Sequence, residues 1–357
     1  MERFGLVGLP NAGKSSLFNA LTNASALAAR YAFATKDTNV GVSRVHDARL
    51  DALAAMSKSR NVVPATVQVV DIGGLAEGAS KGEGLGNRFL GGIREVDAIV
   101  FVLRAFHDDD VPGSDDPLEH LRILELELAL ADLETVESRL GRAQKAAKAD
   151  RSLAEDAAAL EAAHAALADG RPIYRAGLDP SVRATLAPHF LLTNKPVLAV
   201  VNVGEDELDA IPSMVARVEA ELPGADVLGI CVQLEAEAIQ LDDEDRAEML
   251  DALGLGEGAL PRMVRAAYHL LGLRTFFTTG EKESRAWTFR AGAKAPECAG
   301  RIHSDMQRGF IRAEVIHWDE LLEIGSWTKA KDVGKLRVEG KDYEVVDGDV
   351  LEIRFNV

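Results

Sequence analysis

The first residues that could carry chemistry lie close to the start of the chain and read Gly8-Leu9-Pro10-Asn11-Ala12-Gly13-Lys14-Ser15. This run matches the pattern Gly-x-x-x-x-Gly-Lys-Ser/Thr in full. Glycines let backbone N–H groups turn toward an anion, the lysine reaches the β and γ phosphates, and the hydroxyl that follows ligates Mg²⁺. We therefore predict a phosphate-binding loop in which the contacts come from Asn11, Ala12, Gly13, Lys14, Ser15 and Ser16.

A second candidate element is the run Asp71-Ile72-Gly73-Gly74, which follows a short apolar segment. In this position Asp71 would hold Mg²⁺ through water, and the backbone N–H of Gly74 would sense the γ-phosphate. The alternative is a tight turn without a ligand. The next residue is Leu75, whose hydrocarbon side chain cannot orient an attacking water, so we expect slow intrinsic hydrolysis.

Two further segments fit a nucleotide-dependent switch. Thr35 lies between the two elements above, where a threonine would complete the Mg²⁺ coordination, although other threonines are close to it in sequence. The run Gly78 to Gly86 holds three polar or charged residues among its four glycines, and such loops change conformation in nucleotide switches. A merely flexible loop is the alternative reading.

The base-reading element is predicted at Asn202-Val203-Gly204-Glu205, where guanine-specific proteins carry Asn-Lys-x-Asp. Glu205 is longer than that aspartate and Val203 replaces the lysine that lies along the base, so both argue against tight guanine recognition. We expect ATP as the substrate and GTP as a weaker one. Asn202 would brace the base and the phosphate loop, and Cys231 follows an apolar strand in the loop behind the base. The sequence leaves open whether a K⁺ ion binds near Asn11.

Other candidates carry less information. His107 precedes three aspartates, but adjacent loop residues rarely converge on one metal ion, so a solvated charge run is the simpler reading. Trp287, Trp318 and Trp327 could stack on RNA bases or lie in a core. A small-molecule kinase would need an acceptor pocket and an arginine-rich lid, and the sequence suggests neither.

The elements that must position these residues alternate between strands and helices. Apolar runs at 4–7, 65–70, 98–103 and 197–201 predict buried strands of a mostly parallel sheet covered on both faces. Between residues 118 and 169, leucines recur at helical spacing: Leu126, Leu130, Leu133 and Leu140, then Leu153, Leu160 and Leu167. They predict an antiparallel helical hairpin, with a capping box from Ser152 to Glu155. Residues 336–355 read as three strands joined by turns at 339–342 and 347–349.

Bulk properties bound the protein further. The chain has 357 residues and a net charge of −17, so it has no global basic footprint for nucleic acid. Two cysteines are too few for a disulfide framework, which fits a reducing compartment. We find no apolar run long enough to span a membrane and no signal peptide, and we expect a cytoplasmic monomer.

Taken together, these motifs resemble the YchF or Obg-like ATPase family, a branch of the Obg-related P-loop proteins, over essentially the whole chain. The segments that carry the resemblance are the phosphate loop, Gly78 to Phe89, Leu128 to Leu133, Asn202 to Glu205, Arg285 to Thr288 and Asp347 to Val357. The resemblance implies an α/β P-loop domain from residues 1–117 and 190–272, an inserted helical hairpin at 118–189, and a C-terminal ubiquitin-like β-grasp (TGS) domain at 273–357. It also implies a preference for ATP and an association with ribosomes in translation or stress responses. Contact with RNA through the C-terminal domain is left open.

Two departures from the family pattern stand out. Members with a histidine shortly after the strand at 98–103 use it to position water, whereas Arg104-Ala105-Phe106 leads here to Asp110-Val111-Pro112-Gly113 without a histidine at that place. The cysteine that often precedes the switch threonine is Ala34 here. We therefore expect a slow ATPase that switches a ribosome-facing surface, with a GTPase and a nucleotide-gated binding module of negligible turnover as alternatives.

Overall fold

The computed structural model describes residues 2–26, 39–73, 85–109 and 112–356. Its contacts divide the chain into two compact units, one of Met1–Ser43 with Gln68–Leu271 and one of Arg44–Val67 with Gly272–Val357. This differs from the three segments expected from the sequence in two respects. The helical hairpin belongs to the first unit, and residues 44–67 belong to the second.

The first unit is built on a six-stranded sheet with the order β2-β4-β1-β5-β6-β7. In that order the strands are β2 (Asn39–Val45), β4 (Ala65–Asp71), β1 (Arg3–Val7), β5 (Ala98–Arg104), β6 (Val197–Asn202) and β7 (Val227–Ile230). The pairs β4–β1, β1–β5, β5–β6 and β6–β7 are parallel. All seven residues of β5 and all six of β6 are buried, as expected for central strands covered on both faces. The predicted parallel α/β sheet is confirmed.

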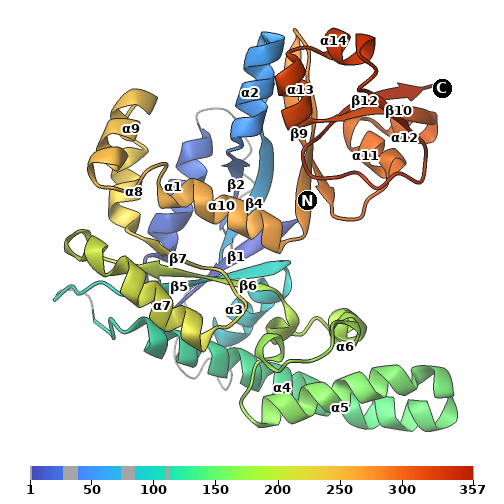
Figure 1. Cartoon of the computed structure of the whole chain (residues 1–357). Helices are drawn as coiled ribbons and strands as arrows, with labels where there is room; N and C mark the ends of the chain where they lie inside the picture. The colour runs from blue at the N-terminus through green and yellow to red at the C-terminus, as the bar shows by residue number, and fades with distance from the viewer. Residues whose placement is uncertain (1, 27–38, 74–84, 110–111, 357) are drawn as a thin grey trace. The chain divides into compact units, whose positions relative to one another are not determined.

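Helices cover both faces of this sheet (Figure 1). Ile99, Phe101 and Leu103 of β5 belong to a core that includes Ile93, Leu124 and their neighbours on α3, α4 and α7. Helix α10 contacts β5, β6 and β7, while α1 packs against α8. The helices of this unit are α1 (Lys14–Ala26), α3 (Leu85–Arg94), α4 (Pro117–Ala149), α5 (Ala154–Ala168), α6 (Pro180–Leu186), α7 (Ile211–Glu221), α8 (Val232–Ala238), α9 (Asp243–Ala252) and α10 (Ala259–Leu270).

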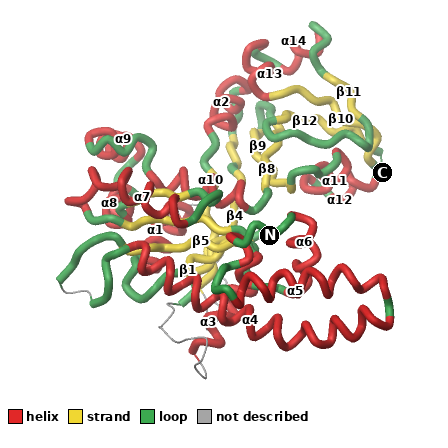
Figure 2. Tube along the Cα trace, turned by 60° about the horizontal axis from the view of Figure 1, so that its bottom comes forward, coloured by secondary structure: helices red, strands yellow, loops and turns green. Residues whose placement is uncertain are grey.

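The predicted hairpin consists of α4 and α5, which lie side by side in both views (Figures 1 and 2). Helix α4 is 33 residues long, and its first half packs on the sheet through Leu121, Leu124 and Leu128. Its second half packs on α5, where Val136 meets Leu160. One continuous helix therefore serves both cores, which explains why the hairpin does not separate as a unit of its own.

Two details of the predicted hairpin are wrong. The capping box at Ser152 does not form, because the carboxylate of Asp150 accepts from the backbone N–H of Ser152 at 2.9 Å and starts a short 3₁₀ turn instead. Helix α5 then begins without a side-chain cap. Leu126 and Leu153 are 53% and 44% exposed, so the leucine spacing overstates the interface between the helices. Among the described residues no helix is long and apolar enough to cross a membrane.

The second unit holds another six-stranded sheet, with the order β11-β10-β12-β8-β9-β3. Its strands are β3 (Asn61–Val63), β8 (Leu273–Thr278), β9 (Glu283–Arg290), β10 (Phe310–His317), β11 (Arg337–Glu339) and β12 (Asp349–Phe355). Its helices are α2 (Ala48–Ser57), α11 (Ala295–Ile302), α12 (Ser304–Arg308), α13 (Trp318–Ile324) and α14 (Trp327–Asp332). Without β3, the strand order is that of a β-grasp fold, with α11 packed on the sheet through Cys298.

One strand predicted in this unit does not form. The segment between β11 and β12 makes a single bridge at Glu344 with Lys294, and a buried carboxylate explains why. Asp349 accepts from the hydroxyl of Tyr343 at 2.7 Å and from the backbone N–H of Val346 at 2.9 Å. These bonds hold the segment as a turn rather than as a sheet strand.

Candidate functional site

The glycine-rich loop at Gly8–Gly13 connects β1 to the N-terminus of α1. Gly8 is confined because a Cβ there would lie 2.5 Å from the carbonyl oxygen of Val102 on the neighbouring strand. Asn11 has φ 61° and Gly13 has φ 90°, so both residues adopt the left-handed region that turns a short loop back on itself. The loop therefore ends with the N-terminal N–H groups of α1 available for an anion.

Lys14 is the first residue of α1, and its side chain reaches back into this loop. Its side chain is 7% exposed, and its ammonium group donates to the carbonyl oxygen of Leu9 at 2.8 Å. Burial lowers the pKa of Lys14 to about 8, and the negative charge of Asp71 partly offsets that effect. The ammonium is thus held across the loop in a poorly solvated position, where a polyphosphate would be a stronger partner than one carbonyl.

Ser15 and Asp71 meet at the carboxyl edge of the sheet. The hydroxyl of Ser15 donates to Oδ2 of Asp71 at 2.9 Å. The other carboxylate oxygen, Oδ1, is buried and has no hydrogen-bond partner among the described residues. A hydroxyl beside an unpaired carboxylate oxygen is an oxygen donor set that fits Mg²⁺. These two residues would hold the ion, directly or through water.

Asn202 joins the phosphate loop to the loop after β7, at the end of the sheet where we predict the base to bind. Its side-chain amide donates to the carbonyl oxygen of Ala12 at 3.1 Å, and its Oδ1 accepts from the backbone N–H of Val232 at 3.1 Å. Cys231 is buried next to Val232, and burial, with a contribution from the charge of Glu205, raises the pKa of its thiol. Asn202, Glu205 and Cys231 are therefore neighbours, as a purine site at this place requires.

The side chain of Val203 does not lie along the predicted base, unlike the lysine that occupies this position in guanine-specific proteins. Its side chain is 2% exposed and belongs to the core with Ala199 and Val201, so it points into the protein. Only its backbone is available to a base. Glu205 is exposed, and the backbone N–H of Gly204 is taken by the carboxylate of Glu207 at 3.2 Å. Sequence reasoning missed Glu207, although its spacing of three residues from Gly204 is typical of a helix cap.

Thr35, Gly74, Leu75 and most of the run Gly78–Gly86 lie outside the described residues, so their predicted roles stay predictions. Ser16 is exposed at the start of α1. The structure thus brings together Lys14, Ser15, Asp71, Asn202 and Cys231 from four separate stretches of sequence.

The loop after β5, where the sequence lacks the expected histidine, is organised by Arg104. This guanidinium is 2% exposed and donates to the carbonyl oxygens of Phe106 at 3.0 Å and Pro112 at 3.3 Å. His107 lies outside on the same loop, 70% exposed, between Asp115 at 3.0 Å and Asp109 at 3.2 Å. These hydrogen bonds raise the pKa of His107. A charged residue closing a wholly apolar strand was the sequence signal for Arg104.

Comparison with known proteins places this geometry in a family. The model for the C-terminal domain of YchF-type GTPases, described as a protein of unknown function, matches residues 273–356. A model described as 50S ribosome-binding GTPase matches residues 3–136. The curated protein "Ribosome-binding ATPase YchF" of Bacillus subtilis is 46% identical over 362 residues, covering 99% of both chains. This chain belongs to the YchF family.

Other YchF proteins agree with this assignment. The Escherichia coli O157:H7 protein with the same description is 44% identical over 358 residues, again covering 99% of each chain. The solved structure of the Schizosaccharomyces pombe YchF GTPase is 32% identical and superposes with a TM-score of 0.88, covering 99% of this chain and 97% of that one. The YchF fold therefore extends from the phosphate loop to the β-grasp unit.

Proposed function

We propose that this protein binds ATP with Mg²⁺ at the glycine-rich loop, hydrolyses it slowly to ADP and phosphate, and uses the bound nucleotide to control association with the ribosome. The observation that carries the proposal is the Lys14–Ser15–Asp71 cluster, tied through Asn202 to the base-reading end of the sheet. The Bacillus subtilis and Escherichia coli relatives are both described as ribosome-binding ATPases, which supports ATP as the nucleotide and the ribosome as the partner. We place its action in the cytoplasm.

The reaction we propose is in-line attack of water on the γ-phosphate of ATP. Lys14 and the backbone N–H groups of Asn11–Ser15 would bind the β and γ phosphates and stabilise the charge that grows there. Mg²⁺, when bound, would neutralise phosphate charge. Ser15 and Asp71 would orient it, with Thr35 as a further ligand. Leu75 cannot orient the water, so turnover is slow unless another group acts.

ATP is favoured over GTP because of the residues at the end of β6. A guanine reader needs a carboxylate that accepts from the base N1–H and amine, whereas Glu205 is one methylene longer and Val203 is turned into the core. Sites built on hydrogen bonds reject a mismatched base strongly. The description of one matching family model as a GTPase makes GTP the direct competitor in any test.

The test is phosphate release by the purified protein from ATP and from GTP, each with and without ribosomes. We expect slow release that is faster with ATP than with GTP, and co-sedimentation with ribosomes that differs between ADP and a non-hydrolysable ATP analogue. Faster release from GTP would overturn the ATP assignment. Because Leu75 cannot orient a water, the alternative function is a nucleotide-gated binding module with negligible turnover. Co-sedimentation that depends on the nucleotide, together with no release of phosphate, would support that alternative.

A further inference from the structure

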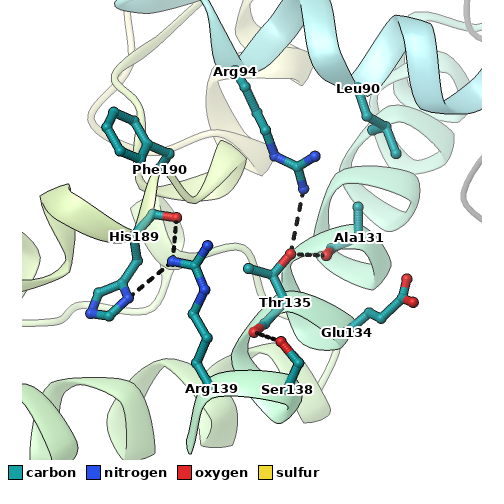
Figure 3. Close-up of a pocket in the computed structure, with 9 residues that line it drawn as sticks. All are labelled: Leu90, Arg94, Ala131, Glu134, Thr135, Ser138, Arg139, His189 and Phe190. Atoms are coloured by element: carbon teal, nitrogen blue, oxygen red, sulfur yellow. Dashed lines mark hydrogen bonds between the residues drawn. The ribbon is translucent and has the colours of Figure 1, made fainter. Parts of the chain in front are cut away.

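An open pocket of ≈ 580 Å³ lies on the first unit, away from the residues assigned to nucleotide (Figure 3). It is formed by the last turns of α3, the middle of α4 and the turn at 187–190. Its charged lining consists of Arg94, Arg139 and Glu134, together with His189. Figure 3 shows the two guanidinium groups entering from opposite sides, while Glu134 points away from both. We call this the α3–α4 pocket.

Both guanidinium groups are available to an anion. In the part of the chain that the structure describes, the guanidinium group of Arg94 makes one hydrogen bond, from its NH2 nitrogen to Oγ1 of Thr135 at 3.4 Å, and that of Arg139 bonds only through its NH1 nitrogen. Among the described residues neither arginine pairs with a carboxylate. The charge of Arg94 interacts with Asp132 over a longer distance, but both oxygens of that carboxylate accept hydrogen bonds from the backbone at 192–193. Unpaired arginines in a concave site are a typical arrangement for phosphate.

Arg139 is also held in place. Its NH1 nitrogen donates to Nδ1 of His189 at 3.1 Å and to the carbonyl oxygen of His189 at 3.0 Å. The other ring nitrogen of His189, Nε2, lies 2.7 Å from the carboxylate of Asp156. This network assigns the proton to Nε2, so that Nδ1 can accept from Arg139. The remaining N–H groups of the arginine are thereby presented to the pocket with little loss of side-chain freedom on binding.

Phe190 forms the rim of the pocket and is unusual in two respects. It is 64% exposed, and its backbone adopts the left-handed region with φ 53° and ψ 40°. A bulky residue in this conformation is strained, a cost that glycine or asparagine would avoid. Its ring gains little burial in return. An exposed aromatic ring next to cationic side chains is a surface on which a nucleic-acid base can stack.

We propose that the α3–α4 pocket binds single-stranded RNA, with a backbone phosphate between Arg94 and Arg139 and a base stacked on Phe190. The net charge of −17 opposes long-range attraction of RNA, so recognition has to come from local groups such as these. The proposal goes beyond the proposed function and does not depend on which nucleotide the glycine-rich loop binds. It also differs from RNA contact through the C-terminal domain.

The experiment measures binding of a labelled ten-nucleotide uridine RNA to the full-length protein by fluorescence anisotropy at several salt concentrations. We expect Arg94→Ala and Arg139→Ala each to weaken binding about tenfold and to reduce the salt slope by about one. Phe190→Ala should weaken binding of the single strand about tenfold while leaving a duplex RNA of equal length unchanged. Lys145→Ala, which removes one exposed charge about 9 Å along α4 beyond Arg139 and outside the pocket lining, is the matched control and should stay within about twofold.

Melting temperature and ATP binding report whether each variant is folded. If Arg139→Ala does not fold, Arg94→Ala and Phe190→Ala carry the test alone, because both side chains are exposed. The RNA assignment is overturned if the wild type does not bind the oligomer, if these variants bind like wild type, or if Lys145→Ala weakens binding equally. Tighter binding of a phosphoserine peptide, or equal competition by inorganic phosphate with no effect of Phe190→Ala, would also overturn it. None of these outcomes alters phosphate release from ATP, so the two proposals fail separately.

Discussion

The side-chain amide of Asn202 donates a hydrogen bond to the carbonyl oxygen of Ala12 at 3.1 Å, across 190 residues of sequence. The same side chain accepts from the backbone N–H of Val232 at 3.1 Å. One buried amide thus fixes the phosphate loop against the loop that backs the base. We therefore expect phosphate binding and base binding to be coupled through this side chain.

Replacing Asn202 tests this coupling. Asn202→Ala leaves two buried backbone groups unpaired, so we expect a loss of about 1–3 kcal/mol in the free energy of unfolding and at least tenfold weaker binding of ATP. Asn202→Asp keeps the acceptor for Val232 but turns a carboxylate toward the Ala12 carbonyl, so it should impair ATP binding no less than alanine does. Denaturant unfolding and calorimetry measure both effects. Asn61→Ala, which removes an exposed hydrogen bond to Glu283, should cost under about 0.5 kcal/mol.

Gly13 lies against the side chain of Asn202, which leaves no room for a larger residue at this position. Its φ is 90°, and a Cβ at this position would lie 2.4 Å from Nδ2 of Asn202. We expect Gly13→Ala to lower the free energy of unfolding by about 2 kcal/mol and to weaken ATP binding, since strain and overlap act together. Gly141→Ala is the control, because Gly141 lies inside α4 with nothing within 4 Å of its Cβ position. That variant should gain about 0.5–1 kcal/mol, and equal effects of the two substitutions would contradict the assignment.

The lowered pKa of Lys14 predicts a pH dependence. Since burial lowers this pKa to about 8, the free protein loses the ammonium as the pH rises above that value. Phosphate groups favour the charged form, so binding takes up a proton, and the affinity for ATP should fall by up to about tenfold per pH unit above pH 8. The unliganded fold should become more stable over the same range, because the unfolded chain holds more protons there.

Calorimetric titrations in buffers of different ionisation enthalpy at pH 8.5 measure this proton uptake directly. Lys14→Arg keeps its charge at high pH, so its affinity for ATP should be nearly independent of pH between 7.5 and 9.5. A wild-type affinity that is equally flat over this range would show that Lys14 does not titrate there.

The base of the hairpin depends on Asp132, which is fully buried. Its carboxylate accepts from the backbone N–H of Leu192 at 2.9 Å, and from the N–H and hydroxyl of Thr193 at 2.7 Å each. Asp132→Ala leaves these donors without a partner, so we expect a loss of about 2–4 kcal/mol in thermal or denaturant unfolding. Glu134→Ala on the same helix removes an exposed carboxylate and should stay within about 0.5 kcal/mol. A similar loss in both variants would argue against the Asp132 network.

Much of this architecture could be predicted from the sequence where one local pattern decides the structure. The apolar runs at 98–103 and 197–201 became wholly buried strands because strands covered on both faces need unbroken hydrophobic residues. The run at 65–70 became strand β4 with Thr66 and Gln68 half-buried. The spacing around Lys14 specified the phosphate loop. Alternation along β6 could also have shown that Val203 points inward, since it is in phase with Ala199 and Val201.

Features that depend on tertiary contacts could not be predicted in this way. The capping box at Ser152 was wrong because Asp150 competes for the same backbone donor. The grouping of residues 44–67 with the C-terminal unit rests on contacts such as the ion pair of Arg49 with Asp347 at 2.7 Å. No local sequence pattern predicts a contact between residues so far apart in the chain. Arg94 and Arg139 share a pocket only because α3 packs beside α4, and each looks like an ordinary surface arginine in the sequence.

The most direct test of the central claim is a calorimetric titration of ATP and of GTP, each with Mg²⁺, into the wild-type protein and Lys14→Ala. We predict that the wild type binds ATP more tightly than GTP by at least about tenfold, and that Lys14→Ala weakens ATP binding by a similar factor while keeping the wild-type melting temperature within a few degrees. Tighter binding of GTP, or wild-type affinity for ATP in a folded Lys14→Ala variant, would contradict the account.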